Sequence, residues 1–162
     1  MENKKVIIQG SSRSKGNTAN SIAAISEKHN IDVIDLNNYT ISYYDYESKN
    51  LNDDFLPLIK SIIENYDTLI FATPVYWYNM SGIMKVFFDR FSDLIRVEKE
   101  TGRKLKGKNM FVISNSHSDR IEKSFYIPFQ KSADYLGMNY TGELHLNADK
   151  IKDFNNIELI QL

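Results

Sequence analysis

Residues 10–18, with the sequence GSSRSKGNT, form a hydroxyl-rich loop between Gly10 and Gly16. An apolar run at residues 6–8 precedes the loop, and a stretch predicted as a helix follows it at residues 19–28. The first amides of a helix lack intrahelical partners and carry partial positive charge, so an anion binds favourably there. We therefore predict a phosphate site at this loop.

The side chains of the loop suit the same role. Hydroxyl groups and an amide that caps the helix can donate hydrogen bonds, and an arginine fork fits phosphate oxygens. The candidate phosphate ligands are Ser11, Arg13, Ser14, Asn17 and Thr18, with further positive charge from Lys15. The glycine spacing matches neither a P-loop nor the dinucleotide fingerprint G-x-G-x-x-G. An ordinary turn between a strand and a helix is the alternative.

A second informative stretch, with the sequence TPVYWYNMSG, lies at residues 73–82. Proline fixes the backbone as the chain leaves a predicted strand, and three large aromatic side chains follow it. Displaying them to water is unfavourable unless a ligand covers them, and a planar ring could do so. The candidate residues are Pro74, Val75, Tyr76, Trp77, Tyr78 and Asn79. The alternative is that these aromatic residues anchor the loop in the protein's own core.

A third polar loop, SNSHS at residues 114–118, follows another apolar run. Ser114, Asn115 and His117 are its candidate ligand-binding residues. His117 could hydrogen-bond a ligand, but a histidine in a polar surface loop is the simpler interpretation, because a lone histidine is weak evidence of chemistry.

The elements that position these loops follow from hydrophobic periodicity. Strands are predicted at residues 6–9, 31–36, 68–73, 110–113 and 138–146, and helices at 19–28, 52–63, 81–94, 123–136 and, more weakly, 148–160. Apolar strands that alternate with amphipathic helices imply an α/β fold with a parallel sheet covered on both faces. Ligands bind at the carboxyl ends of such strands, so the three loops should meet there.

Two stretches are predicted as loops. Residues 96–108 are polar and charged, which indicates a surface loop. Residues 39–52 carry four tyrosines among polar residues, at positions 39, 43, 44 and 46. A loop of this length is usually functional or mobile. Its tyrosines could pack over a ligand, against a second subunit, or over the edge of the sheet.

Composition narrows the class of protein. The 162 residues suit a single domain, residues 1–162, and 42% apolar and 25% charged residues are ordinary for a globular protein. A net charge of −1 does not suggest a nucleic-acid partner, and the absence of cysteine excludes disulfides and cysteine-held clusters. No apolar run approaches the length of a signal peptide or a membrane span, so we expect a cytoplasmic protein without a membrane partner.

A phosphate loop beside an aromatic loop suits a flat phosphorylated cofactor, and FMN is the natural candidate. The stretches at 10–18 and 73–82, with MKVFFDR at 84–90 and KGK at 106–108, resemble the flavodoxin-like NAD(P)H-dependent FMN reductase family. The resemblance covers residues 4–146. It implies a flavodoxin-like three-layer sandwich with a five-stranded parallel sheet of order 2-1-3-4-5, non-covalent FMN, and a homodimer or homotetramer.

The resemblance also implies residue roles. Ser11, Arg13, Ser14, Asn17 and Thr18 would hold the phosphate, residues 74–79 would line the isoalloxazine, and residues 114–117 would flank its far side. Many relatives carry cysteines in the segment matching 39–52, and some hold an iron–sulfur cluster there. This chain has no cysteine, which rules out that electron partner. The loop at 114–118 is also bulkier than the glycine-rich loop common in the family.

The implied activity is electron transfer from NADH or NADPH through FMN to a flat small-molecule acceptor such as a quinone, a nitro or azo compound, or free flavin. The flavin carries the chemistry, so no catalytic side chain is predicted. One face of the flavin should be open, and because a single face cannot hold nicotinamide and acceptor together, the two substrates should alternate in a ping-pong scheme. One alternative is a flavodoxin-type electron carrier, although such carriers tend to be strongly acidic. The other is a phosphate- or nucleotide-binding module without redox chemistry.

Overall fold

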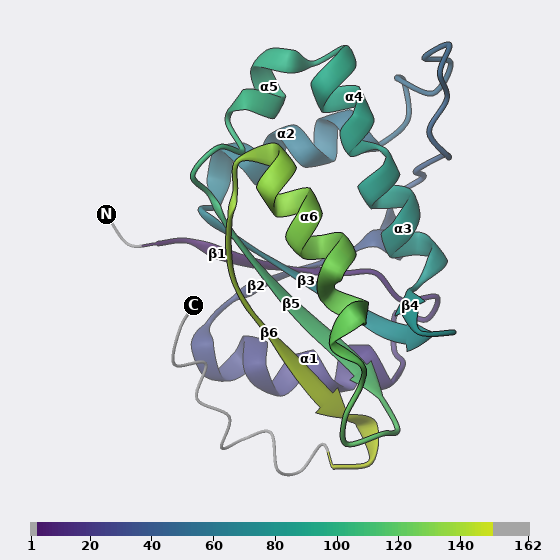
Figure 1. Ribbon diagram of the computed structural model, residues 1–162, viewed down its shortest axis with the longest axis vertical. Coiled ribbons are helices and arrows are strands. Elements are labelled where there is room, and N and C mark those ends of the chain that lie inside the picture. Colours follow the sequence, from purple (N-terminus) through teal and green to yellow (C-terminus); the bar gives the residue numbers. More distant parts are fainter. Residues whose placement is uncertain (1–2, 151–162) are drawn as a thin grey trace.

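The computed structural model describes residues 3–150, which are built around a twisted parallel β-sheet (Figure 1). The five parallel strands are β1 (Lys5–Gln9), β2 (Asp32–Asp35), β3 (Thr68–Tyr76), β5 (Asn109–Ser116) and β6 (Asn139–Asn147). Their spatial order is β2-β1-β3-β5-β6, so the predicted order of five parallel strands is confirmed. The predicted strand count misses β4 (Asn79–Met80), a two-residue strand that pairs antiparallel with the end of β3.

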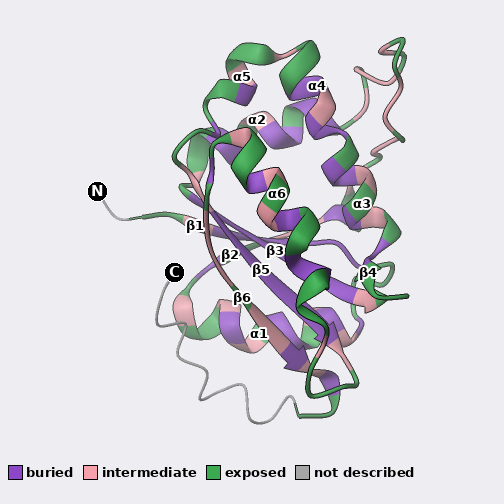
Figure 2. Ribbon diagram, in the orientation of Figure 1, coloured by how far each residue is buried: buried purple, intermediate pink, exposed green. Residues whose placement is uncertain are grey.

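The central strands are buried on both faces, as expected for a parallel sheet covered by helices. β1 is buried from Val6 to its end, and β3 is buried from Thr68 to Pro74 (Figure 2). β3 also runs three residues beyond its predicted end. It continues through Pro74, which lies opposite Asn115 of β5, and so carries the aromatic stretch out past the edge of the sheet.

The helices differ in detail from the prediction. They are α1 (Asn17–His29), α2 (Phe55–Asn65), α3 (Gly82–Asp89), α4 (Phe91–Arg96), α5 (Lys99–Arg103) and α6 (Ile127–Leu136), with 3₁₀ turns η1 (Leu36–Asn38) and η2 (Lys123–Tyr126). The helix predicted at 81–94 is two helices that part at Arg90, and the stretch 96–108 predicted as a loop contains α5. Most of the weak helix predicted at 148–160 lies outside the described residues.

The two faces of the sheet bury separate cores. α1 covers one face, where Ile22 and Ile25 pack in a cluster with Ile7 and Ile70. On the other face α2, α3, α4 and α6 enclose a larger cluster rich in phenylalanine. Its rings meet edge to face, as Phe71 and Phe88 do with centroids 4.8 Å apart. Packing in both cores fixes the strands, and so fixes the edge of the sheet that their carboxyl ends form.

Residues 39–52 are fastened to the second core by a buried arginine. The Arg90 side chain is 1% exposed, and it donates hydrogen bonds of 3.1 Å to the carbonyl oxygens of Ser42 and Asn50. It also pairs with the carboxylates of Asp53 and Asp93. Burial raises the pKa of Asp53, but hydrogen bonds from Arg90 and two backbone amides outweigh burial and hold it below its usual range. The loop is therefore pinned at its base by a charged network.

The tyrosines of this loop divide between core and surface. Tyr39 packs against the larger core, whereas Tyr43 and Tyr46 are 79% and 78% exposed. The rings of Tyr43 and Tyr46 are therefore mostly open to solvent and are not packed over the edge of the sheet. Among the described residues, no helix combines the length and apolar character that crossing a bilayer needs.

Candidate functional site

The three predicted loops meet at the carboxyl ends of β1, β3 and β5 (Figure 1). Ser81, which follows β4, donates a hydrogen bond of 2.7 Å from its hydroxyl to the carbonyl oxygen of Gly10. Asn17 Nδ2 lies 3.2 Å from His117 Nε2, which joins the loop after β1 to the loop after β5. The prediction that these loops come together is confirmed.

The first loop passes close to α3, and Gly10 allows this approach. A Cβ atom at Gly10 would lie 2.8 Å from Met84 Cε and 2.9 Å from Met84 Cβ, closer than real contacts permit. Ser81 caps α3 by accepting a hydrogen bond from the amide of Met84 at 3.2 Å, so one side chain orders both the helix and the loop.

The start of α1 is open to an anion. Its N-cap is Gly16, which offers no side-chain cap, and the prediction that Asn17 caps the helix is wrong because Asn17 is the first helical residue. The amide of Asn20 is bonded to the carbonyl oxygen of Gly16 at 3.0 Å, while the amides before it precede the helical ladder. Arg13 lies beside them, since a Cβ at Gly16 would be 3.3 Å from Arg13 Nε.

The remaining side chains of this loop are placed unequally. Ser14 is exposed, whereas Ser11 and Thr18 are 4% and 2% exposed. Ser11 Oγ is 3.5 Å from the backbone amide of Arg13, and the carbonyl oxygen of Ser11 accepts a hydrogen bond from the Asn37 side chain. Arg13 and Ser14 are thus the accessible side chains of the five predicted ligands, with Asn17 half-buried.

His117 is oriented by partners on both sides. Its Nδ1 lies 3.0 Å from Asp149 Oδ1, and its Nε2 faces the amide nitrogen of Asn17. His117 is a surface histidine, as the simpler interpretation predicts, and its two contacts connect the loop after β1 to Asp149, which follows β6.

The side chains of Ser114 and Asn115 point into the fold. Ser114 Oγ lies 2.6 Å from the Tyr126 hydroxyl and 2.8 Å from His145 Nδ1. Asn115 Nδ2 donates to Ser21 Oγ at 2.8 Å and to a carbonyl oxygen of β6 at 3.1 Å. Both side chains make hydrogen bonds within the protein, and the backbone at both positions pairs with β3 and β6 in the sheet, so the two residues support the site from inside the fold. Burial raises the pKa of the Tyr126 hydroxyl.

His145 is a supporting residue that the sequence analysis did not identify. Its Nε2 lies 3.1 Å from Ser116 Oγ and 2.9 Å from the carbonyl oxygen of Ser118, so the ring holds the loop after β5 against β6. In the sequence His145 stands in an alternating strand, and only its register opposite Ser114 reveals the contact.

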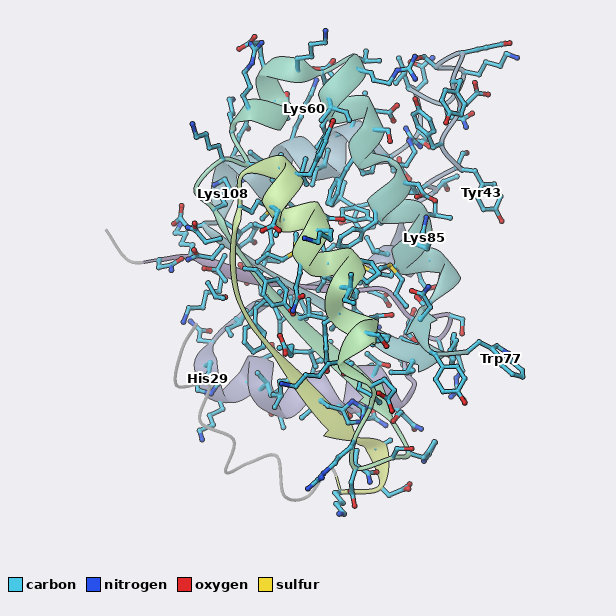
Figure 3. All side chains as sticks on the ribbon, viewed as in Figure 1. His29, Tyr43, Lys60, Trp77, Lys85 and Lys108 are labelled. Atoms are coloured by element: carbon cyan, nitrogen blue, oxygen red, sulfur yellow. The ribbon has the colours of Figure 1, made fainter. Side chains whose placement is uncertain are left out.

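The aromatic stretch forms a strained hairpin. Tyr76 of β3 pairs with Asn79 of β4, and the two residues between them, Trp77 and Tyr78, have φ of 48° and 64°. Such turns prefer asparagine and glycine, because side chains are disfavoured at positive φ. Backbone strain of this kind concentrates at functional sites. Trp77 and Tyr78 are 94% and 80% exposed, and Trp77 projects from the body of the protein (Figure 3), so these two residues are not core anchors.

A cavity of about 630 Å³ lies between this hairpin and the segment after β5. Its size is typical of small-molecule sites, which range over about 300–1,000 Å³. It is lined by Val75, Trp77, Tyr78, Ser116, Ser118, Arg120, Ile121, Glu122 and Phe125. His117 lies in the sequence between the lining residues Ser116 and Ser118, and its contact with Asn17 connects this wall of the cavity to the start of α1. The cavity and the uncapped start of α1 together fit a planar ring with a phosphate tail.

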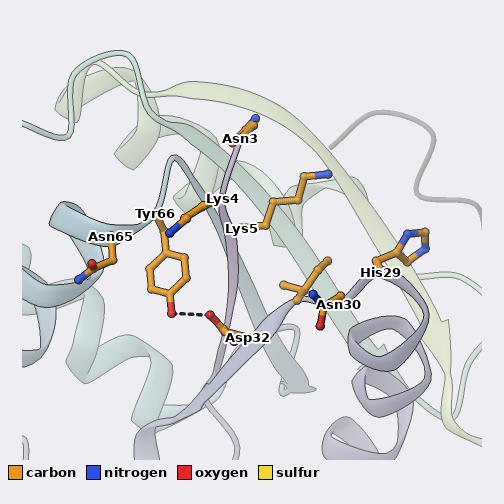
Figure 4. A pocket seen from close by; sticks show the side chains of 9 residues that line it. Asn3, Lys4, Lys5, His29, Asn30, Asp32, Asn65 and Tyr66 are labelled. Atoms are coloured by element: carbon orange, nitrogen blue, oxygen red, sulfur yellow. Dashed lines mark hydrogen bonds between the residues drawn. The ribbon is translucent and has the colours of Figure 1, made fainter. Parts of the chain in front are cut away.

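Other hollows lack these features. One of about 600 Å³ lies at the opposite end of the sheet (Figure 4), where the Tyr66 hydroxyl donates to Asp32 at 2.7 Å. Burial and, after it, the Asp32 carboxylate raise the pKa of Tyr66 to about 12. A groove of about 500 Å³ runs between residues 36–43 and α3. The described part of the chain contains no cluster of three or more histidine, cysteine or acidic side chains that could hold a metal.

Comparison with known proteins agrees with this geometry. The model of the NADPH-dependent FMN reductase family matches residues 3–152. YwqN of Bacillus subtilis (strain 168), described provisionally as an NAD(P)H-dependent FMN-containing oxidoreductase, is 28% identical over 149 residues, which cover 86% of this chain and 82% of that protein.

Two solved structures show the shared fold. The Trp repressor binding protein from Bacillus subtilis has a TM-score of 0.71 and 23% identity, with coverage of 94% of this chain and 96% of that one. An FMN-dependent NADH-azoreductase from Bacillus anthracis, solved in complex with FMN, has a TM-score of 0.67 and 14% identity, with 94% of both chains covered. The family match spans most of the sequence and includes all three loops of the candidate site, so the chain belongs to the NADPH-dependent FMN reductase family.

Proposed function

We propose that this protein passes electrons from NADH or NADPH through bound FMN to a flat acceptor, and that the two substrates use the same site in turn. The observation that carries the proposal is the cavity between Trp77 and the segment after β5, together with the contact from His117 of that segment to Asn17 at the uncapped start of α1. Bound FMN would supply the two-electron redox chemistry that connects the nicotinamide to the acceptor.

The chain supplies binding and orientation. The first amides of α1, the Arg13 guanidinium and the Asn17 side chain hold the phosphate, helped by the helix dipole. The β3–β4 hairpin and the backbone at residues 114–118 enclose the ring. The buried side chains of Ser114 and Asn115 hold the end of β5 in place, which keeps the segment that follows it in position beside the ring without reorganisation.

Absorbance and anaerobic reduction test this function. The purified protein, or protein reconstituted with FMN, should be yellow, and NADH or NADPH should bleach it before any acceptor is present. A quinone should then restore the colour, and double-reciprocal plots at several quinone concentrations should be parallel. Intersecting plots would show that both substrates bind together. A yellow protein that neither nicotinamide bleaches is an electron carrier, and a protein that binds no FMN is a non-redox module.

We also propose a homodimer or homotetramer, because Tyr43 and Tyr46 stay exposed on a pinned loop beside the groove along α3. Aromatic residues on a rigid exposed segment are typical of subunit interfaces. The cytoplasmic location expected from the sequence stays a prediction.

A further inference from the structure

The wall of the cavity that faces the hairpin carries two charged side chains without an assigned role. Arg120 and Glu122 lie on either side of Ile121, and all three line the cavity opposite Trp77 and Tyr78. Within residues 3–150, neither the Arg120 guanidinium nor the Glu122 carboxylate makes a hydrogen bond or an ion pair. Both groups are therefore available to a ligand.

The neighbouring carboxylates are already engaged. Asp119 accepts hydrogen bonds from Lys150 at 2.6 Å and from Asn147 at 2.7 Å, and these hold its pKa below the usual range. Asp149 is bonded to His117. The loops after β1 and β5 carry three cations, Arg13, Lys15 and Arg120, and Glu122 is the carboxylate on these loops that makes no hydrogen bond or ion pair within residues 3–150. The field at this edge of the sheet favours anions.

Arg120 suits a particular kind of anion. A guanidinium is planar, binds carboxylate or sulfonate oxygens through two parallel hydrogen bonds, and also stacks on aromatic surfaces. Trp77 and Tyr78 offer exposed ring faces across the same cavity. A planar aromatic molecule with an acidic substituent could stack on the aromatic rings of one wall and pair with Arg120 on the other.

We propose that the cavity selects planar aromatic acceptors that carry one carboxylate or sulfonate group, and that Arg120 is the residue that binds this group. The proposal rests on the proposed function, since it names the class of acceptor for that site. Glu122 limits the preference, because its carboxylate repels a second negative charge. Removing Arg120 and removing the charge of Glu122 should therefore shift the selectivity in opposite directions.

The test compares 1,4-naphthoquinone-2-sulfonate with neutral 1,4-naphthoquinone on the FMN-loaded full chain. Binding is read from quenching of Trp77 fluorescence, which is unambiguous because Trp77 is the chain's one tryptophan, and turnover from kcat/KM. The absence of cysteine also means that neither quinone can alkylate a thiol. The measured quantity is the ratio of sulfonated to neutral quinone, in affinity and in kcat/KM.

Four variants test the proposal through the change that each should cause in this ratio. Arg120→Ala should lower the ratio about 10-fold or more, as expected for a lost charged hydrogen bond, and Arg120→Lys should restore part of it. Glu122→Gln should raise the ratio. Lys123→Ala, which removes an exposed neighbouring cation outside the cavity, should leave it unchanged.

An unchanged ratio in Arg120→Ala, or an equal loss in Lys123→Ala, would overturn the proposal, because only a general field would then be acting. Absence of quenching by both quinones would overturn it too, since the cavity would not bind planar molecules. Failure of the proposed function looks different: the quenching ratios would follow the variants while NADH and NADPH left the flavin unreduced.

Discussion

Arg13→Ala tests whether the loop after β1 holds a phosphate. The Arg13 side chain lies against Gly16 at the start of α1, but it is exposed and has no partner of its own among the described residues. A hydrogen bond between charged groups contributes about 1.5–3 kcal/mol, and exposure to water places Arg13 in the lower part of this range. We expect FMN affinity to fall by about 1.5–2 kcal/mol, which is about 10- to 30-fold in Kd.

The assay is fluorescence titration of the apoprotein with FMN and with riboflavin, which shares the ring but lacks the phosphate. Riboflavin affinity should be almost unchanged in Arg13→Ala. Raising the salt concentration should narrow the gap between wild type and variant for FMN alone, because salt screens exposed charges. Equal losses of FMN and riboflavin affinity would refute the reasoning and show that Arg13 acts on the ring or on the fold.

Three further predictions concern stability and assembly. Gly10→Ala should lower the free energy of unfolding in urea by about 1–3 kcal/mol, because its Cβ would overlap Met84, whereas Gly82→Ala, with nothing within 4 Å, should not destabilise. Asp53→Asn should cost about 1.5–3 kcal/mol at pH 7 by weakening the network of Arg90. Folding lowers the pKa of Asp53, so the stability that its carboxylate contributes is fully present above the unfolded-state pKa of about 4 and is lost as the pH falls through the folded-state pKa. A difference in unfolding free energy between wild type and variant that persisted in acid would contradict this origin. Light scattering should give at least twice the chain mass of 18.8 kDa, and a monomer at micromolar concentration would contradict the proposed assembly.

The parallel sheet and the meeting of the three loops were predictable because they depend on local signals. Apolar runs mark the strands, amphipathic stripes mark the helices, and the geometry of parallel sheets brings the carboxyl ends together. α5 was missed because its one buried residue is Gly102, and no apolar stripe announces a helix there. α5 packs so closely on α4 that a Cβ atom at Gly102 would collide with the carbonyl oxygen of Leu94. Because this is a tertiary contact, no local sequence pattern reveals it.

The candidate site was predictable by position but not by side-chain direction. Ser114 and Asn115 stand where expected, yet their side chains turn inward because β6 places His145 and the Leu146 carbonyl beside them. That register joins residues about 30 positions apart, and no local pattern encodes it. Arg120 was missed for a related reason, since it belongs to no motif and becomes relevant only when the hairpin faces it across the cavity.

These placements divide the site into a rigid part and a variable part. The polar side chains nearest the sheet make hydrogen bonds within the protein, so this part of the site is held in a fixed arrangement; they belong to Ser81, Ser114 and Asn115. A substitution at one of these residues would break such a hydrogen bond and disturb the fold. The exposed side chains lie further out, on the hairpin and at residues 118–122, where a substitution changes the cavity wall and leaves the sheet intact. Selectivity for the acceptor should therefore vary through the outer wall, whereas retention of FMN should depend on the inner edge.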